Sequence, residues 1–89
     1  MGKFRLSIYE PEHVLLRNWL IDKRYDAKLT QRELAERLNT VHSLVAKVER
    51  GERRLDIVEF ITFCEALNAN PCECISQIQS FGETKKKQQ

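Results

Sequence analysis

The chain has 89 residues, of which 42% are hydrophobic and 31% are charged, and its formal net charge is +2 at pH 7. This length is enough for one domain with a modest core and leaves little room for a separate effector domain. There is no apolar run that can span a membrane and no secretion signal, so we expect a cytoplasmic protein without a membrane partner. The number of cysteines is odd, three, which argues against a disulfide framework.

Residues 2–9 alternate between apolar and polar side chains. Phe4, Leu6 and Ile8 share one face if this stretch is extended, which predicts a short strand or an arm over residues 1–10. A lone strand needs a partner. The segment therefore either pairs with its copy in a second subunit or lies as ordered coil on the body of the protein.

Residues 11–25 are predicted to form the first helix. Pro11 suits the first helical position, and Glu12 favours the positive end of the helix dipole. Helical spacing predicts an inward stripe of Leu15, Leu16, Trp19 and Leu20. Trp19 is interpreted as a core residue.

Residues 29–54 predict two short helices joined by a tight turn. Thr30 and Glu33 form a capping-box pattern at the start of the first helix. Asn39 tolerates a left-handed backbone and opens the turn, and Gly51 is a good left-handed end for the second helix.

The second of these helices, from about Val41 to Arg50, has two unlike faces. At roughly 100° per residue, its apolar side chains gather on one side; they are Val41, Leu44, Val45 and Val48. The other side carries short or basic side chains, which are His42, Ser43, Ala46, Lys47 and Arg50. A face of this kind can enter the major groove of DNA, which is about 12 Å wide.

Two further helices complete the predicted all-α fold. A capping-box pattern at Asp56 opens a helix that ends near Asn68. Pro71 opens a fifth helix, and Gly82 is predicted to end it. Residues 83–89 contain three lysines and no apolar side chain, which predicts a disordered basic tail.

The motif over residues 30–50 resembles the helix-turn-helix of the Cro/CI and XRE family of phage and bacterial repressors. The likeness rests on Gln31, Leu34, Ala35, Leu38, Ser43, Val45, Lys47, Glu49 and Gly51. This resemblance implies a compact five-helix, lambda-repressor-like domain, here over residues 11–82.

The resemblance also implies the residues that contact DNA. The family positions that touch base edges fall on His42, Ser43 and Lys47, and a lysine can donate to guanine O6 and N7. Leu44 lies at the border of the face and is either a contact to a thymine methyl group or a core residue. The expected phosphate contacts are Gln31, Thr30, Arg50, Arg53 and Arg54.

Two structural expectations follow from the same resemblance. In the family, an arginine near the end of the first helix pairs with a glutamate near the end of the reading helix. Arg24 and Glu49 fit that spacing, which predicts a partly buried ion pair. Val41 stands where many relatives have a Ser or Thr cap, so Thr40 or water must satisfy the first amides of the reading helix.

Together these features predict a sequence-specific DNA-binding transcription regulator, and more narrowly a repressor. As a homodimer it would bind a pseudo-palindromic operator in double-stranded DNA, with two reading helices about 34 Å apart. In the family the dimer contact is often placed in the fifth helix and the N-terminal segment. No cofactor, metal, small-molecule ligand or catalytic group is predicted, so the chain is not expected to be an enzyme.

Two alternatives stay open. The same fold can serve as a protein-interaction module, such as an antitoxin or an accessory subunit. Alternatively, Cys72 and Cys74 can act as a redox or metal sensor, since a thiolate is favoured at a helix N-terminus. Structural zinc needs about four ligands, and the further candidates are only Cys64, His13 and His42.

Overall fold

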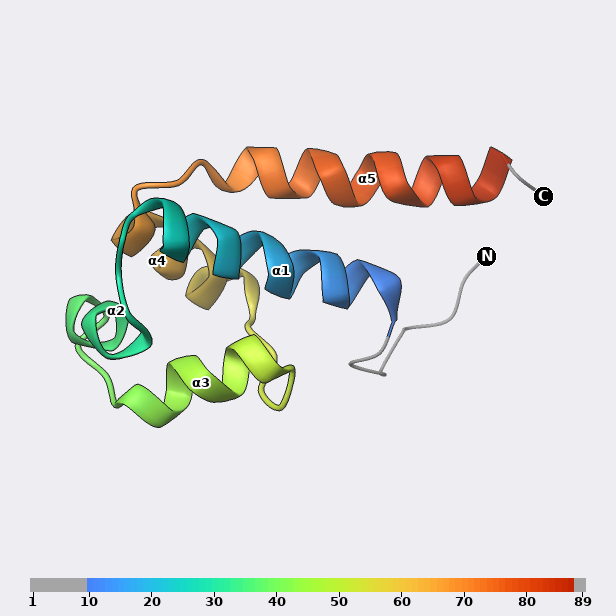
Figure 1. The fold of residues 1–89 in the computed structure, drawn as a ribbon. Coiled ribbons are helices and arrows are strands. Elements are labelled where there is room, and N and C mark those ends of the chain that lie inside the picture. Colours follow the sequence, from blue (N-terminus) through green and yellow to red (C-terminus); the bar gives the residue numbers. More distant parts are fainter. Residues whose placement is uncertain (1–9, 88–89) are drawn as a thin grey trace.

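The computed structural model describes the backbone of residues 10–87 and the side chains of residues 10–81. In this range the chain forms the helices α1 (Pro11–Asp26), α2 (Gln31–Arg37), α3 (His42–Arg50), α4 (Ile57–Leu67) and α5 (Pro71–Lys87), and no strand (Figure 1). The predicted all-α class with five helices is confirmed. The predicted arm lies outside the described residues, apart from Glu10.

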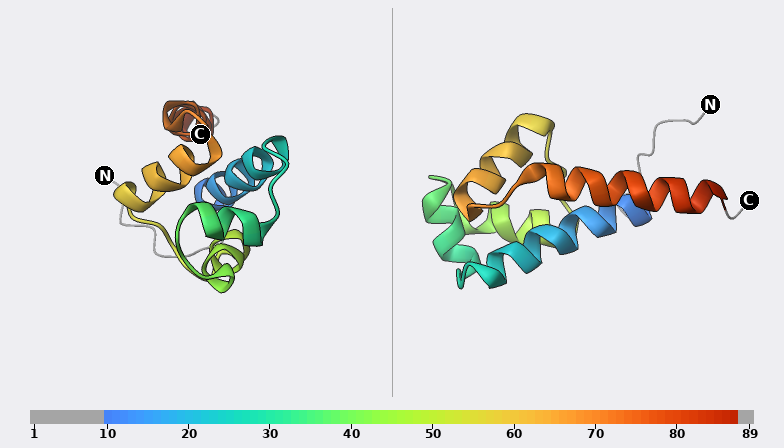
Figure 2. Two further views of the ribbon diagram at one scale, coloured as in Figure 1. Left: turned by 90° about the vertical axis from the view of Figure 1, so that its left-hand side faces the viewer. Right: turned by 90° about the horizontal axis from the view of Figure 1, so that it is seen from above.

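Helix α1 runs through the middle of the molecule. Helix α5 lies along one side of it and α3 along the other, while α2 and α4 close the end where α1 finishes (Figures 1 and 2). The motif helices α2 and α3 pack directly on each other. This arrangement leaves the side of α3 that faces away from α1 open.

The core draws side chains from all five helices. Its buried members are Trp19, Leu20, Leu34, Ala35, Val45, Val48, Phe60, Phe63, Cys64, Leu67 and Cys74. The rings of Trp19 and Phe60 lie 6.1 Å apart, so Trp19 is a core residue as predicted. Burying a large apolar side chain contributes roughly 1.5–3 kcal/mol, and these contacts hold the helices together.

Local signals set the ends of the motif helices. Thr30 Oγ1 accepts from the Glu33 amide at 3.0 Å, and the Glu33 carboxylate accepts from the Thr30 amide at 2.8 Å, which completes the predicted capping box. Asn39 has the left-handed φ of 57° that the turn requires. Gly51 ends α3 at a φ of 81°, where a Cβ atom would also lie 2.6 Å from the Arg17 guanidinium carbon.

The prediction that α5 ends at Gly82 was wrong. The helix continues through this glycine to Lys87, so the part of the predicted disordered tail up to Lys87 is helical in its backbone. One glycine inside a helix costs only about 1 kcal/mol relative to alanine.

Candidate nucleic-acid interface

Helix α3 presents a polar face to solvent. Ser43, Lys47 and Arg50 are exposed and lie four and three residues apart, so they share one side of the helix. His42 is also exposed, at the first turn. Val41 precedes the helix without a side-chain cap, as predicted for a valine.

The inner side of α3 is broader than the apolar pattern predicts. Val45 and Val48 are buried as expected, but Ala46, which was placed on the outward face, is only 7% exposed. Helix α3 packs against both α1 and α2, so a larger part of its surface is covered than one apolar stripe predicts. Leu44 packs against the core at partial exposure, which favours its interpretation as a core residue.

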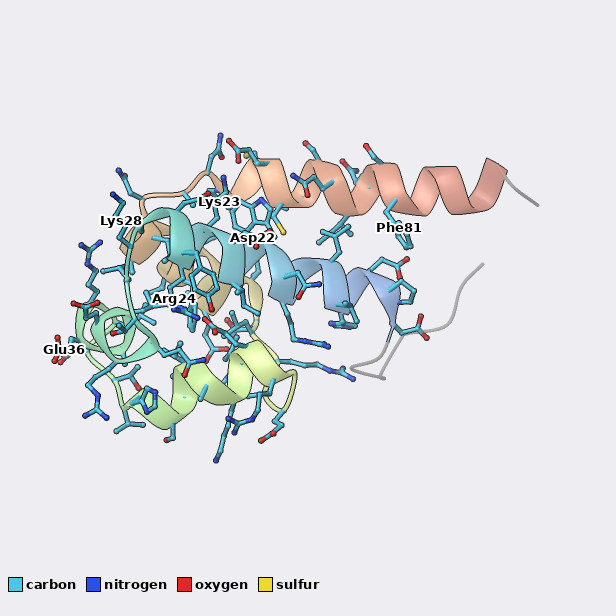
Figure 3. The ribbon with its side chains drawn as sticks, in the orientation of Figure 1. Asp22, Lys23, Arg24, Lys28, Glu36 and Phe81 are labelled. Carbon is cyan, nitrogen blue, oxygen red and sulfur yellow. The ribbon has the colours of Figure 1, made fainter. Side chains whose placement is uncertain are left out.

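The predicted ion pair between α1 and α3 is present and buried. Arg24 Nε and Nη2 donate to the two oxygens of Glu49 at 2.7 and 2.9 Å, and Nη1 donates to the Leu29 carbonyl at 2.8 Å. The two side chains are 8% and 7% exposed. The hydrogen bond to Glu49 raises the pKa of Arg24 above its ordinary value, against the lowering effect of burial. Figure 3 shows Arg24 between α1 and α3.

Gln31 extends this pair to the start of α3. Its Nε2 donates to Glu49 Oε1 at 2.8 Å, and its Oε1 lies 3.2 Å from Nε2 of His42. A hydrogen-bonded series therefore runs from the buried Arg24 to the exposed His42. The contact between Gln31 and His42 joins two helices across the turn, and no periodicity within one helix could have revealed it. The phosphate contact of Gln31 stays a prediction.

Two of the basic residues at the end of α3 and in the loop after it, Arg50 and Arg53, are paired with carboxylates. Arg50 Nε lies 2.7 Å from Glu52, and Arg53 Nη2 lies 2.7 Å from Glu59. The side chains of Arg50 and Glu52 are 57% and 52% exposed, and those of Arg53 and Glu59 are 37% and 38% exposed. Ion pairs that are open to solvent contribute little and are screened by salt. Arg54 is exposed and accepts from Arg53 through its carbonyl oxygen. A DNA phosphate can therefore compete for these guanidinium groups at small cost.

The three cysteines do not form a common site. Cys64 and Cys74 are buried in the core, and Cys72 is exposed. Burial raises the pKa of both buried thiols to about 11. Over the part of the chain that the structure describes, no group of three or more His, Cys, Asp or Glu side chains is placed to hold a metal ion. In the same range, no helix combines the length and apolar character needed to cross a membrane.

Comparisons with known proteins identify the family. A helix-turn-helix family model matches residues 20–74. The solved structure of an XRE-family like protein from Pseudomonas syringae pv. tomato str. DC3000 is similar over 83% of this chain and 90% of that one, with 36% identity and a TM-score of 0.77. This chain belongs to the XRE helix-turn-helix family.

A second solved structure shares the fold of this XRE-family chain. It is the clp gene regulator ClgR from Corynebacterium glutamicum, with a TM-score of 0.70 and 23% identity over 89% of this chain and 84% of that one. A search of curated proteins finds no match. Membership of the helix-turn-helix family makes the chain a DNA-binding protein of the transcription-regulator class.

Proposed function

We propose that this XRE-family protein is a repressor that binds a pseudo-palindromic operator as a homodimer. The observation that carries this proposal is the exposed face of α3, where Ser43 and Lys47 stand on a helix that a buried ion pair fixes to α1. In this proposal repression comes from occupying a promoter, and the promoter of the protein's own gene is the first candidate.

We assign base reading to His42, Ser43 and Lys47 and phosphate binding to the basic loop. A lysine at the centre of the face can donate to guanine, and the hydroxyl of a serine suits several bases. Helix α2 begins after Thr30. Its N-terminal amides, together with Gln31, are proposed to bind a DNA phosphate. The proposed phosphate clamps are Arg50, the last residue of α3, and Arg53 and Arg54 in the loop after it.

The dimer contact is assigned to α5 together with the N-terminal segment. Helix α5 packs on the side of α1 that is opposite α3 (Figures 1 and 2), so a second copy that contacts α5 leaves the reading face open. Ile75 on α5 remains 42% exposed and is available for such a contact. In the dimer the two reading helices would lie about 34 Å apart.

DNA binding measured by fluorescence anisotropy tests this proposal. The DNA upstream of the protein's own gene is compared with scrambled DNA of the same length at two salt concentrations. We expect selective binding that weakens steeply with salt, because phosphate contacts release counterions. Lys47→Ala should lose selectivity. Lys28→Asn is the matched control, because it removes one charge far from α3 (Figure 3) at a φ of 59° that asparagine accepts.

The outcomes separate the candidate functions. Equal, weak binding to both DNAs, unchanged by Lys47→Ala, would contradict the assignment of the reading face and would favour the protein-interaction alternative. Sedimentation of the protein with and without the selected DNA tests the homodimer directly, since a monomer bound to a single half-site would contradict it.

A further inference from the structure

Helix α4 is apolar on both of its sides. Its inner side is buried in the core, but Ile57, Val58 and Ile61 on its outer side are 60%, 69% and 40% exposed. They are three of the six exposed large hydrophobic side chains among the described residues, and all three lie in the first five residues of the helix. Single exposed apolar side chains are ordinary, whereas a cluster of them marks a contact surface. We call these three side chains the α4 face.

An apolar groove continues the α4 face toward the helix-turn-helix. Its volume is about 160 Å³, and its lining is mainly Leu38, Leu44, Leu55, Val58 and Phe63. Val58 belongs to both the α4 face and the groove, so the two form one continuous surface. A cavity of about 150 Å³ with a similar lining takes up benzene. The groove therefore has room for one aromatic ring.

Residues 2–9 have the pattern and the length to cover this surface. Phe4, Leu6 and Ile8 share one face when this segment is extended, and Phe4 offers an aromatic ring. Eight extended residues reach about 26–29 Å. The molecule measures only 22 and 19 Å along its two shorter axes. The segment joins the body at Glu10, and α1 and α4 both begin toward the same end of the molecule (Figures 1 and 2), so the α4 face lies within reach.

The charges of the segment and of α4 are complementary. The sequence from Leu55 to Thr84 contains no Lys or Arg. Asp56 directly before the α4 face and Glu65 one turn after it are both exposed. Lys3 and Arg5 alternate with the apolar residues of the segment. Their long side chains can extend along an apolar surface and bring their charges close to these carboxylates.

Another hollow near the start of α1 does not suit this segment. It is lined by Leu16 and Leu20 but also by Arg17, Arg53 and Arg54, which would repel the two cations of the segment. Its volume of about 60 Å³ is also less than half that of the groove beside α4. Charge and size therefore both favour the surface on α4.

We propose that residues 2–9 lie extended on α4 of their own chain, with Phe4 in the groove and Leu6 and Ile8 on the α4 face. The order follows from the chain direction, since the groove lies on the helix-turn-helix side of the α4 face. Because the groove lies between the helix-turn-helix and α4, the segment braces the two against each other. This inference goes beyond the proposed function and leaves α5 and the outward face of the segment for the homodimer contact.

Cross-linking in the full chain tests the position of the segment. Cys72→Ser removes the exposed native thiol. Leu6→Cys is then combined with Ile61→Cys on the α4 face, or with Gln79→Cys on α5 as the matched control, since both partner positions are exposed. A short bis-maleimide should cross-link the variant with Ile61→Cys at least about tenfold faster than the control, because docking raises the effective concentration of the two thiols. The product should have the mass of one chain.

Thermal melting and amide chemical shifts measure the contribution of the contact. The full chain with Phe4→Ser, Leu6→Ser and Ile8→Ser should melt at least about 4 °C lower than the wild type, because it loses the burial of three large apolar side chains. Outside the segment, the largest changes in amide chemical shift should fall on Val58 and its neighbours in the groove. Tyr9→Ser changes the opposite face of the segment and should melt as the wild type does.

Three results would overturn the inference. Equal cross-linking of the two variants would mean that the segment is not held on α4. A product with the mass of two chains would place the segment on a second copy instead. Changes in amide chemical shift limited to the start of α1 would mean that the apolar side chains of the segment lie elsewhere. DNA binding by α3 is measured separately, so failure of this inference leaves the proposed function intact.

Discussion

Loss of one partner of the Arg24–Glu49 ion pair should remove a large part of the stability of this protein. Arg24 makes three hydrogen bonds, and the side chains of the pair are 8% and 7% exposed. In Arg24→Met the carboxylate of Glu49 stays in the interior with the amide of Gln31 as its remaining partner. A buried charge that loses its counter-ion costs about 3–5 kcal/mol.

That cost is large on the scale of a small domain. At about 0.05–0.15 kcal/mol per residue, a chain of this size has a free energy of unfolding of about 4–13 kcal/mol. For a domain of this size, 1 kcal/mol shifts the melting temperature by roughly 4–8 °C. We therefore expect Arg24→Met to melt at least about 12 °C lower than the wild type, and to be partly unfolded at 37 °C if the wild type lies at the low end of the range.

Urea unfolding followed by circular dichroism measures the effect. Glu49→Leu should destabilise as much as Arg24→Met, because it strands the opposite charge. The double variant should recover much of the loss, since apolar groups can replace both charges. The pair Arg50–Glu52 is the control, because its separation is also 2.7 Å but its side chains are 57% and 52% exposed. If Arg24→Met were no more harmful than Arg50→Met, the reasoning from burial would be refuted.

Two further predictions concern acid and thiol chemistry. The hydrogen bond from Arg53 helps to hold the pKa of Glu59 at about 2, below its ordinary 4.5. The ionised Glu59 therefore stabilises the protein above pH 4.5, and this stabilisation is lost as the pH falls toward 2. In acid titrations monitored by circular dichroism, Glu59→Gln should lose less stability over this interval than the wild type does. An acid profile of Glu59→Gln equal to that of the wild type would contradict the prediction. In thiol titration with a disulfide reagent, the native chain should react quickly at Cys72 only, because Cys64 and Cys74 are buried, and at all three after denaturation. Rapid reaction of all three would disprove the packing. The redox alternative would be removed if serine at both Cys72 and Cys74 left the response of DNA affinity to oxidation the same as in the wild type.

Signals that act within a few residues made most of the fold predictable. The capping boxes at Thr30 and Asp56 both form, and Asn39 and Gly51 take the left-handed conformations that the turn and the helix end require. Each of these features depends on a side chain and a backbone group that lie within one helical turn of each other. Their positions can therefore be read without knowledge of tertiary contacts.

The features that were missed depend on distant neighbours or on small energy differences. Ala46 is buried on a helix that packs against two others, and the contact between Gln31 and His42 crosses the turn. The end of α5 was misplaced because one glycine costs only about 1 kcal/mol, which is too little to end a helix by itself. The base and phosphate contacts stay predictions, since they depend on how the protein docks on DNA.

The ion pair has a consequence for recognition that packing alone would not give. The apolar contacts of Val45 and Val48 attach α3 to the core, but hydrophobic attraction is non-directional and permits small rotations of a helix. The hydrogen bonds of Glu49 to Arg24 and Gln31 are directional, and they fix the rotation of α3 about its axis. A buried pair contributes little net stability relative to apolar groups. We therefore expect its greater value here to be that it helps to determine which side chains of α3, Lys47 among them, face outward.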